Sequence, residues 1–308
     1  MKVAVLYGGI SAEREVSLSS GKGIMNALKN RGHEVVAIDF HPERLDEILN
    51  LEADIVYIAL HGRYGEDGKI QALLDMLSIP YVGSGVQGSA LAMDKAKSKL
   101  FFEHEGTRVA NEQILYKYDF NEQDFKLSLK LPVVVKPNQE GSTIGLTIAE
   151  DMETLMNGIK QAFEFDQTVM LEEFISGKEV TVSVLGEQGE EQALPVIEIV
   201  PKNKYYDYEA KYAVGGSEHI IPARLSAEQT AYVQKHAVRA HQVLGCEVYS
   251  RVDFIVPEDE TQLPVILEVN TLPGMTPTSL YPDAAKEIGL SYEDMVEKLI
   301  ELSLKKHK

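Results

Sequence analysis

The sequence predicts a mixed fold, with an α/β unit of Rossmann-like type at the N-terminus and two α+β units after it. Short β-branched segments alternate with helical stretches over the first part of the chain, which is typical of βαβ units around a parallel sheet. Further along, apolar segments follow one another in pairs, which favours antiparallel strands. A chain of 308 residues is long enough to form two or three domains with buried cores.

The first unit is expected over residues 1–92. Its predicted strands are Val3–Leu6, Glu34–Ile38, Asp54–Leu60 and Ile79–Val82. Two of these strands run into glycine turns, at Gly8 and at His61-Gly62, and ligands of such sheets bind at the carboxyl ends of the strands. Glu13 in the first turn is interpreted in two ways, as a ligand for a substrate ammonium group or as an acid that caps the next helix. We interpret His61 as a site residue rather than an ordinary loop histidine.

The second unit is expected over residues 93–178 and the third over 179–308. The second contains a charged helix from about residue 94, strands in PVVVKP and TVMLEEFI, and a helix that begins near Asp151. The third contains strands in KEVTVSVLG and QALPVIEIV, a helix after Ser226, a hairpin and two closing helices. The stretch from Pro201 to Pro222 is too long for an ordinary connection, and its tyrosines Tyr205, Tyr206, Tyr208 and Tyr212 favour a mobile lid over a disordered insertion.

Composition limits the kinds of partner that we expect. The formal net charge of −18 repels nucleic acid, although a few lysines and a divalent ion can still create a nucleotide site within one cleft. The segment MKVAVLYGG lacks the features of a signal peptide, and charges interrupt the apolar runs well before the roughly 20 residues that span a bilayer. A single cysteine, Cys246, fits a reducing compartment, and we expect it to be packed rather than reactive. These features predict a cytoplasmic protein.

The clearest chemical pattern lies in the hairpin formed by YSRVDFIV and PVILEVN. Alternation gives Val252, Phe254, Val256, Val265, Leu267 and Val269 to the core, and places Arg251, Asp253, Glu268 and Asn270 on the other face. If Val256 pairs with Val265, Asp253 lies opposite Glu268, and two such carboxylates repel each other unless a cation lies between them. Oxygen ligands of this kind suit Mg²⁺, so the hairpin predicts a metal site; the alternative is an exposed polar sheet face.

A second pattern points to phosphate binding. Lys136 ends the strand PVVVK, and it is followed by the glycine-flanked loop from Glu140 to Gly145, whose backbone N–H groups are suited to phosphate oxygens. Lys95 is a further candidate for a phosphate contact. The loop lacks the spacing of a P-loop, and the turn after Gly8 is not a dinucleotide fingerprint, so another nucleotide-binding architecture is expected. Glu172 and Glu179 are candidates for ribose hydroxyls, with exposed strand-edge glutamates as the alternative.

Taken together, seven segments resemble one family. They are GGISAEREVSLSSG, HGRYGEDG, MDKAKSK, VVVKPNQEGSTIG, YDYEAKY, SRVDF and LEVNTLPGMTPTSL, in this order along the whole chain. Each segment alone is a weak signal, but the set is similar to the D-alanine:D-alanine ligases of the ATP-grasp superfamily. The resemblance implies a two-part ATP-grasp fold after the Rossmann-like domain, and ATP-dependent formation of D-alanyl-D-alanine for peptidoglycan synthesis, through a D-alanyl phosphate. It also implies that the chain forms homodimers.

The resemblance assigns roles residue by residue. ATP would be held by Lys95, Lys136, Glu172, Glu179 and Lys211, with Phe174, Ile175, Tyr205 and Leu267 near the adenine. Two Mg²⁺ or Mn²⁺ ions would be bound by Asp253, Glu268 and Asn270. The D-alanine sites would be lined by Glu13, His61, Ser142, Tyr212, Arg251, Gly274, Ser279 and Leu280. Among these residues, Glu13 would anchor the ammonium of the first substrate, and Arg251 and the backbone near Gly274 would stabilise the tetrahedral oxyanion.

Two other functions stay open at this point. A ligase of the same fold that joins D-alanine to D-lactate or D-serine has a similar sequence, although relatives that make the D-lactate product tend to carry phenylalanine where this chain has Tyr212. A regulatory protein that binds a nucleotide without catalysis is a different class. The presence of Arg251 beside the predicted metal ligands argues against this class, because a protein that binds a nucleotide without catalysis does not need an oxyanion donor there.

Overall fold

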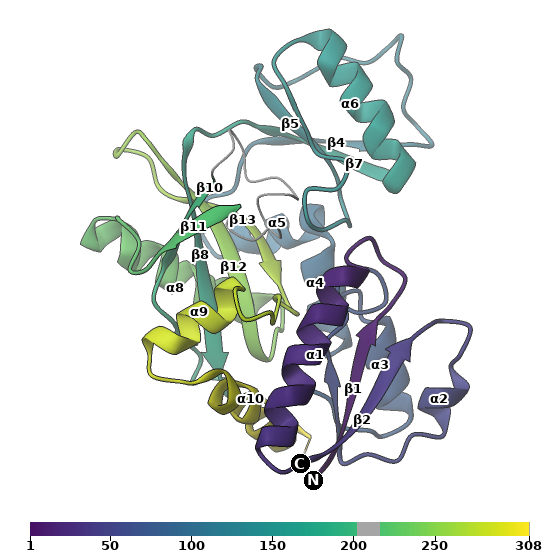
Figure 1. Cartoon of the computed structure of the whole chain (residues 1–308). Helices are drawn as coiled ribbons and strands as arrows, with labels where there is room; N and C mark the ends of the chain where they lie inside the picture. Colours follow the sequence, from purple (N-terminus) through teal and green to yellow (C-terminus); the bar gives the residue numbers. More distant parts are fainter. Residues whose placement is uncertain (202–215, 308) are drawn as a thin grey trace.

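The computed structural model describes residues 1–201 and 216–307. Within these ranges the chain forms three sheets, each with helices packed beside it (Figure 1). The N-terminal and C-terminal parts lie next to each other, while the central part lies above them in the view of Figure 1. No helix in the described ranges combines the length and the apolar character that crossing a membrane requires.

The N-terminal sheet is parallel, as the sequence predicts. Strand β1 (Lys2–Gly8) lies between β2 (Glu34–Phe40) and β3 (Ile55–Ile58), and Leu6 pairs with both Ile38 and Ile58. The predicted strand Ile79–Val82 is wrong as a strand: only a bridge between Tyr81 and Val56 forms, because Pro80 has no N–H to donate and Gly83 turns the chain away at a φ of +97°. The helices of this part are α1 (Arg14–Asn30), α2 (Asp46–Leu49), α3 (Lys69–Met76) and α4 (Val86–Met93).

The central sheet is antiparallel, in the order β4 (Glu112–Tyr116), β7 (Thr168–Glu173), β5 (Val133–Pro137) and β6 (Thr147–Ala149). Helix α5 (Lys95–His104) leads into it, and the Asp94 side chain caps this helix by accepting from the N–H of Lys97 at 3.1 Å. Helix α6 (Met152–Phe165) begins after Asp151, which accepts from the N–H of Thr154 at 2.7 Å, so the predicted start is confirmed. The buried face of α6 packs against this sheet through Leu155, Ile159, Ala162 and Phe163.

The C-terminal sheet contains the order β11-β10-β8-β12-β13, with a short strand β9 paired to β8. Its strands are β8 (Gly177–Gly186), β9 (Gln192–Ala193), β10 (Ile197–Pro201), β11 (Ser217–Ile220), β12 (Val248–Pro257) and β13 (Val265–Asn270). Helix α8 (Ala227–Val243) begins with a capping box at Ser226 and Gln229, which explains why this start could be read from the sequence. The two closing helices are α9 (Leu280–Glu287) and α10 (Tyr292–Lys306).

The β12–β13 hairpin forms, but its register differs from the simplest pairing. Ile255, and not Val256, pairs with Val265. A bulge between Asp253 and Phe254 absorbs the one-residue difference, so Asp253 still lies opposite Glu268. The bulge also corrects one side-chain assignment: Ile266 joins the apolar core, whereas Leu267 faces a cavity.

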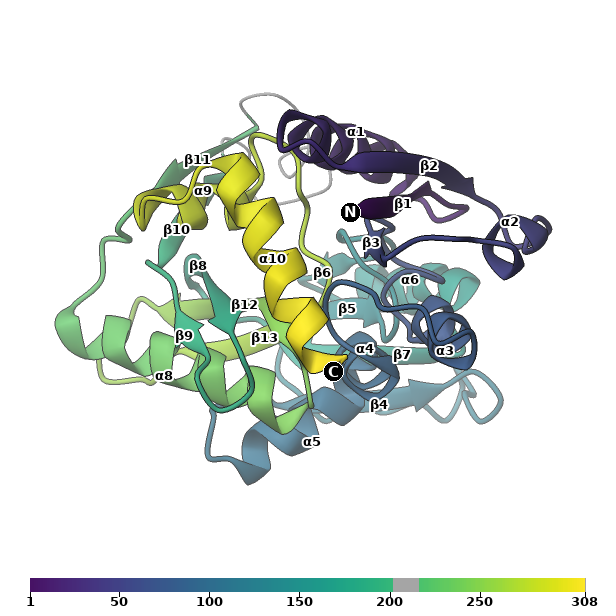
Figure 2. The same ribbon diagram turned by 90° about the horizontal axis from the view of Figure 1, so that it is seen from below.

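The N-terminal and C-terminal parts share one apolar core. Leu299 and Ile300 of α10 belong to the same buried cluster as Val3 and Leu28. At the end of α10, the ammonium of Lys306 lies 4.4 Å from the ring centre of Tyr81 and 3.2 Å from the Glu247 carboxylate. In Figure 2, α10 runs across the face of the molecule between these two parts. The shared core therefore fixes the N-terminal sheet relative to β12 and β13, whose polar faces contribute to the sites described next.

Candidate functional site

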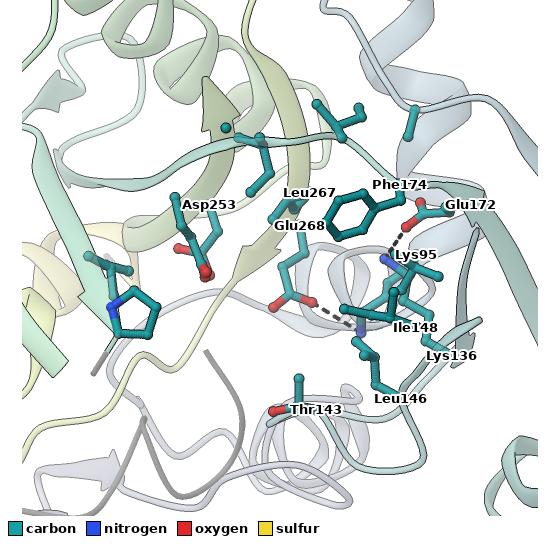
Figure 3. Close-up of a pocket in the computed structure, with 18 of the residues that line it drawn as sticks. Lys95, Lys136, Thr143, Leu146, Ile148, Glu172, Phe174, Asp253, Leu267 and Glu268 are labelled. Atoms are coloured by element: carbon teal, nitrogen blue, oxygen red, sulfur yellow. Dashed lines mark ion pairs between the residues drawn. The ribbon is translucent and has the colours of Figure 1, made fainter. Parts of the chain in front are cut away.

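A large cavity of about 1320 Å³ lies between the central and the C-terminal sheets. Figure 3 shows that β5, β7 and β13 each send side chains into it. Its lining brings together every residue that the sequence assigned to a nucleotide and that lies in the described ranges: Lys95, Lys136, Glu172, Phe174, Ile175, Glu179 and Leu267. Tyr205, Lys211 and Tyr212 lie outside the described residues, as do residues 202–215 of the predicted lid. The rest of that stretch is described, and it contains β11, which pairs with β10.

A buried cluster of charges forms the wall of this cavity beside β7. Glu172 accepts from Lys136 at 2.5 Å and from Lys99 at 2.7 Å, and Lys99 also pairs with Glu112 at 2.6 Å. Burial alone would raise the pKa of Glu172, but the charges of Lys136 and Lys99 outweigh it and lower this pKa to about 2. For Lys136, burial opposes the charged form, but the carboxylates around it prevail and raise the pKa of its ammonium group. Both groups are therefore charged at neutral pH.

Lys99 was not among the residues predicted from the sequence. Its side chain is only 2% exposed, and it donates to the Ala110 carbonyl at 2.8 Å as well as to its two carboxylates. A lysine in the second turn of a charged helix looks like a solvated residue in the sequence. Its three acceptors come from the chain beyond α5, which no local pattern reveals.

The loop from Glu140 to Gly145 joins the cavity to the N-terminal part. Ser142 and Thr143 have φ values of +51° and +62°, a backbone conformation that turns the loop sharply. The hydroxyl of Ser142 donates to the carboxylate of Glu13, and Lys95 donates to the Glu140 carbonyl at 2.7 Å. Glu13 occupies the N-cap position of α1 without a side-chain capping hydrogen bond, so the structure does not decide between the two interpretations of this residue.

Two carboxylates from the polar face of the β12–β13 hairpin, Asp253 and Glu268, line the same cavity (Figure 3). Asp253 accepts from Arg251 at 2.7 and 2.9 Å and from Thr181 at 2.6 Å, and Asn270 donates to it at 3.1 Å. Glu268 pairs with Lys95 at 3.2 Å. The predicted repulsion between the two carboxylates is thus balanced in this structure by an arginine and a lysine.

The polar face of the hairpin carries a small set of oxygen donors on adjacent strands. In the part of the chain that the structure describes, no three His, Cys, Asp or Glu side chains converge. The set is instead two carboxylates and one amide on adjacent strands, with Asp253 opposite Glu268 and Asn270 opposite Arg251. Hard oxygen donors from a few side chains, completed by phosphate oxygens and water, are what Mg²⁺ prefers, so these residues fit such an ion.

A second cavity of about 690 Å³ adjoins the first, because Gly141, Ser142 and Glu268 line both. It contains the described residues that the sequence assigned to substrate: Glu13, His61, Ser142, Arg251, Gly274, Ser279 and Leu280. These residues come from the N-terminal part, from the central loop and from the C-terminal sheet with the chain after it. The second cavity therefore exists only where all three parts meet.

His61 is buried in the wall of the second cavity. Its Nδ1 lies 3.1 Å from the Leu272 carbonyl and its Nε2 lies 3.2 Å from the Ser20 hydroxyl. Burial lowers its pKa, so a neutral ring with Nδ1–H donating to the carbonyl satisfies both contacts. Glu66 also lines this cavity, and burial, reinforced by the charge of Glu13, raises its pKa to about 8. Glu66 was missed in the sequence, although it lies within the HGRYGEDG segment.

The parallel N-terminal sheet, the two later α+β parts and a lysine-lined cavity between them define an enzyme of the ATP-grasp class. Family models described as D-ala D-ala ligase N-terminus and D-ala D-ala ligase C-terminus match residues 2–45 with 43–84, and 101–301. A D-alanine–D-alanine ligase of Halalkalibacterium halodurans is 68% identical over 99% of this chain and 100% of its own. The chain belongs to the D-alanine–D-alanine ligase family.

Two solved structures agree with this placement. A D-alanine–D-alanine ligase from Bacillus anthracis complexed with ATP has a TM-score of 0.84 and 34% identity, over 100% of this chain and 98% of that one. A D-Ala:D-Ser ligase from Enterococcus faecalis has a TM-score of 0.83 and 32% identity, over 98% of this chain and 99% of that one. The expected fold class is therefore confirmed.

Proposed function

We propose that this enzyme joins two molecules of D-alanine to D-alanyl-D-alanine, with cleavage of ATP to ADP and phosphate, and so supplies a precursor of peptidoglycan. The observation that carries the proposal is the pair of adjoining cavities. One has apolar and cationic walls suited to a nucleotide, and the other has acidic and cationic groups suited to an amino acid. They share the Ser142 loop and Glu268, the position at which a phosphate group would pass from one to the other.

The nucleotide takes the larger cavity. Lys95 and Lys136 face its phosphates. The adenine contacts Phe174, Ile175 and Leu267, and the ribose hydroxyls donate to Glu172 and Glu179. Tyr205 and Lys211 complete this set. Asp253, Glu268 and Asn270 hold two Mg²⁺ or Mn²⁺ ions. When bound, these ions neutralise the phosphate oxygens during transfer. In the loaded site, Lys95 exchanges its ion pair with Glu268, and Arg251 its ion pair with Asp253, for negatively charged groups of the substrates.

The first D-alanine places its ammonium against Glu13 and its carboxylate toward the γ-phosphate. A carboxylate oxygen attacks the γ-phosphorus, the bond to the bridging oxygen breaks, and ADP leaves with that electron pair. The product is D-alanyl phosphate. Ser142, which donates to Glu13, and Tyr212 shield it from water.

The second D-alanine lies beside Ser279 and Leu280 at the start of α9, in the cavity that His61 also lines. Its uncharged amine attacks the acyl carbon, and the oxyanion that forms is stabilised by Arg251 and by the backbone N–H groups near Gly274. Collapse of this intermediate expels inorganic phosphate, and the nitrogen loses a proton to give the amide.

The chain divides into a substrate domain over residues 1–92 and two ATP-grasp subdomains over 93–178 and 179–308. The enzyme works as a homodimer in the cytoplasm, without a nucleic-acid or membrane partner. The competing product is D-alanyl-D-lactate or D-alanyl-D-serine, and similarity to the D-Ala:D-Ser ligase keeps the latter as the alternative.

Phosphate release from ATP tests the proposal. The enzyme with ATP and Mg²⁺ is incubated with D-alanine, L-alanine or no amino acid, and products are identified by mass spectrometry, with D-serine and D-lactate as competing acceptors. We expect D-alanine-dependent release with one dipeptide per phosphate. Arg251→Ala should abolish it, whereas Arg239→Ala, which removes an exposed arginine paired with Glu105, should not. Release that does not depend on D-alanine, or none at all, contradicts the proposal.

A further inference from the structure

A histidine and an aspartate form a pair on the wall of the second cavity. His219 belongs to β11 and Asp283 to α9. The Nδ1 atom of His219 lies 2.7 Å from the carboxylate of Asp283. Both line this cavity, and their side chains are 19% and 30% exposed. The two elements lie side by side in Figures 1 and 2. The pair was not singled out in the sequence, and the mechanism above does not use it.

The position of Asp283 connects the pair to the acceptor end of the cavity. Asp283 lies four residues after Ser279, so both side chains are on the same face of α9, and its N–H donates to the Ser279 carbonyl at 3.2 Å. Ser279, Leu280 and Thr278 line the same wall. The pair is thus one helical turn from the residues beside the second D-alanine.

The described lining of this cavity contains more acidic than basic side chains. Among the described lining residues, five are acidic: Glu13, Glu15, Glu66, Glu268 and Asp283. Three of the described lining residues are able to carry positive charge: Arg251, His61 and His219. Burial lowers the pKa of His61, and Arg251 is held by both oxygens of Asp253. An acceptor amino acid brings a further carboxylate into this acidic surrounding.

We propose that His219 is a specificity residue of the acceptor site, which binds the carboxylate of the second amino acid through Nε2 while Asp283 holds Nδ1. The proposal rests on the function proposed above. As an imidazolium, the ring donates at both nitrogens, one to each carboxylate. The Nε2 atom is 3.5 Å from the hydroxyl of Ser217, a distance at which that contact is weak and easily replaced by a ligand oxygen.

A purely structural role predicts something different. In that case the bond between His219 and Asp283 would only fasten β11 to α9, and Nε2 would not matter. His219→Asn separates the two roles, because the amide nitrogen of asparagine takes the place of Nδ1 and nothing takes the place of Nε2. His219→Ala removes both ends.

The test measures the Michaelis constants for the two D-alanines separately, from initial rates over a wide range of D-alanine, in the whole enzyme with ATP and Mg²⁺. We expect both His219 variants to raise the acceptor constant about tenfold, which corresponds to one charge-assisted hydrogen bond at a partly exposed site. The donor constant and kcat should stay within about twofold of the wild type. His33→Ala is the matched control, since His33 pairs with Glu297 at 2.8 Å on another surface.

Each outcome is decisive. An unchanged acceptor constant in His219→Asn, or an equal rise in the donor constant, would overturn the role of Nε2. A wild-type enzyme that forms no dipeptide would instead refute the proposed function, and the two failures are therefore distinct.

Discussion

Replacing Lys99 by methionine should show how much the buried charge cluster contributes to stability. Lys99, Lys136, Glu112 and Glu172 form a cluster of two lysines and two glutamates, which is neutral as a whole. Methionine keeps the length and apolar character of the side chain but leaves the cluster with a net charge of −1. A buried carboxylate without its partner is costly, because the protein interior solvates it poorly.

The size of the effect follows from Glu172. Its pKa is about 2 in the folded protein against an ordinary 4.5, and at about 1.36 kcal/mol per pH unit the lysines stabilise its charged form by about 3 kcal/mol at pH 7. Lys99 supplies part of this and is also the partner of Glu112. We therefore expect Lys99→Met to lower the free energy of unfolding by about 3 kcal/mol, in the lower part of the range for broken buried pairs. Glu172→Gln should cost a similar amount.

The double variant Lys99→Met with Glu172→Gln restores neutrality, because Glu112 and Lys136 remain. Its cost should be smaller than the sum of the single costs by about 1–3 kcal/mol. The chain has no tryptophan, so urea unfolding at pH 7 is followed by far-UV circular dichroism. Lys97→Met, on the same helix but with a side chain 64% exposed, is the control and should cost less than about 0.5 kcal/mol. Additive costs, or a cost of Lys99→Met near that of the control, would refute the reasoning.

Three further predictions concern other parts of the molecule. Burial lowers the pKa of His241 to about 4, so this histidine takes up a proton in the unfolded chain before it does so in the folded protein as the pH falls below 6.5. The free energy of unfolding of the wild type should therefore fall by about 2 kcal/mol between pH 7 and pH 5 through this residue. In His241→Gln the urea midpoint should depend correspondingly less on pH. Gly88→Ala should lower the free energy of unfolding by about 1–3 kcal/mol despite the better helix propensity of alanine, because the new β-carbon would lie 2.5 Å from the Gly245 carbonyl oxygen. An unchanged melting temperature would contradict this packing. Asp253→Asn should reduce kcat on the order of a hundredfold by weakening metal binding while the fold is kept, and normal turnover in this variant would rule out Asp253 as a ligand.

The secondary structure was predictable where local chemistry decides it. Asp151 and Ser226 start helices with their own side chains, and Gly8 ends β1 at a φ of +79°. These signals lie within a few residues of the boundary they determine. The strand predicted at Ile79–Val82 does not form, because Pro80 and Gly83 interrupt its hydrogen bonding. The β-branched residues that favoured a strand there do not outweigh this interruption.

The candidate site was predictable only in part. Alternation along β12 and β13 brought Asp253 opposite Glu268, but the bulge that makes this possible leaves no mark in the sequence. Lys99 and the His219–Asp283 pair depend on partners from distant segments, which a single sequence does not connect. The placement of Glu13 beside Ser142 came from resemblance to a family, because 129 positions separate the two residues.

The two cavities depend on contacts between the parts of the chain more than on any one part. Ser142 reaches Glu13 of the N-terminal part, Lys95 reaches Glu268 of the C-terminal sheet, and both contacts use polar groups that line a cavity. Polar contacts of this kind exchange readily for a charged ligand, whereas the apolar core shared by α10 and the N-terminal sheet does not. The N-terminal and C-terminal parts should therefore remain a fixed frame during turnover, and ligand binding should rearrange mainly the central part against it. Hydrogen exchange with and without ATP tests this division: protection should change in the loop from Glu140 to Gly145 and stay constant in β1 and α10.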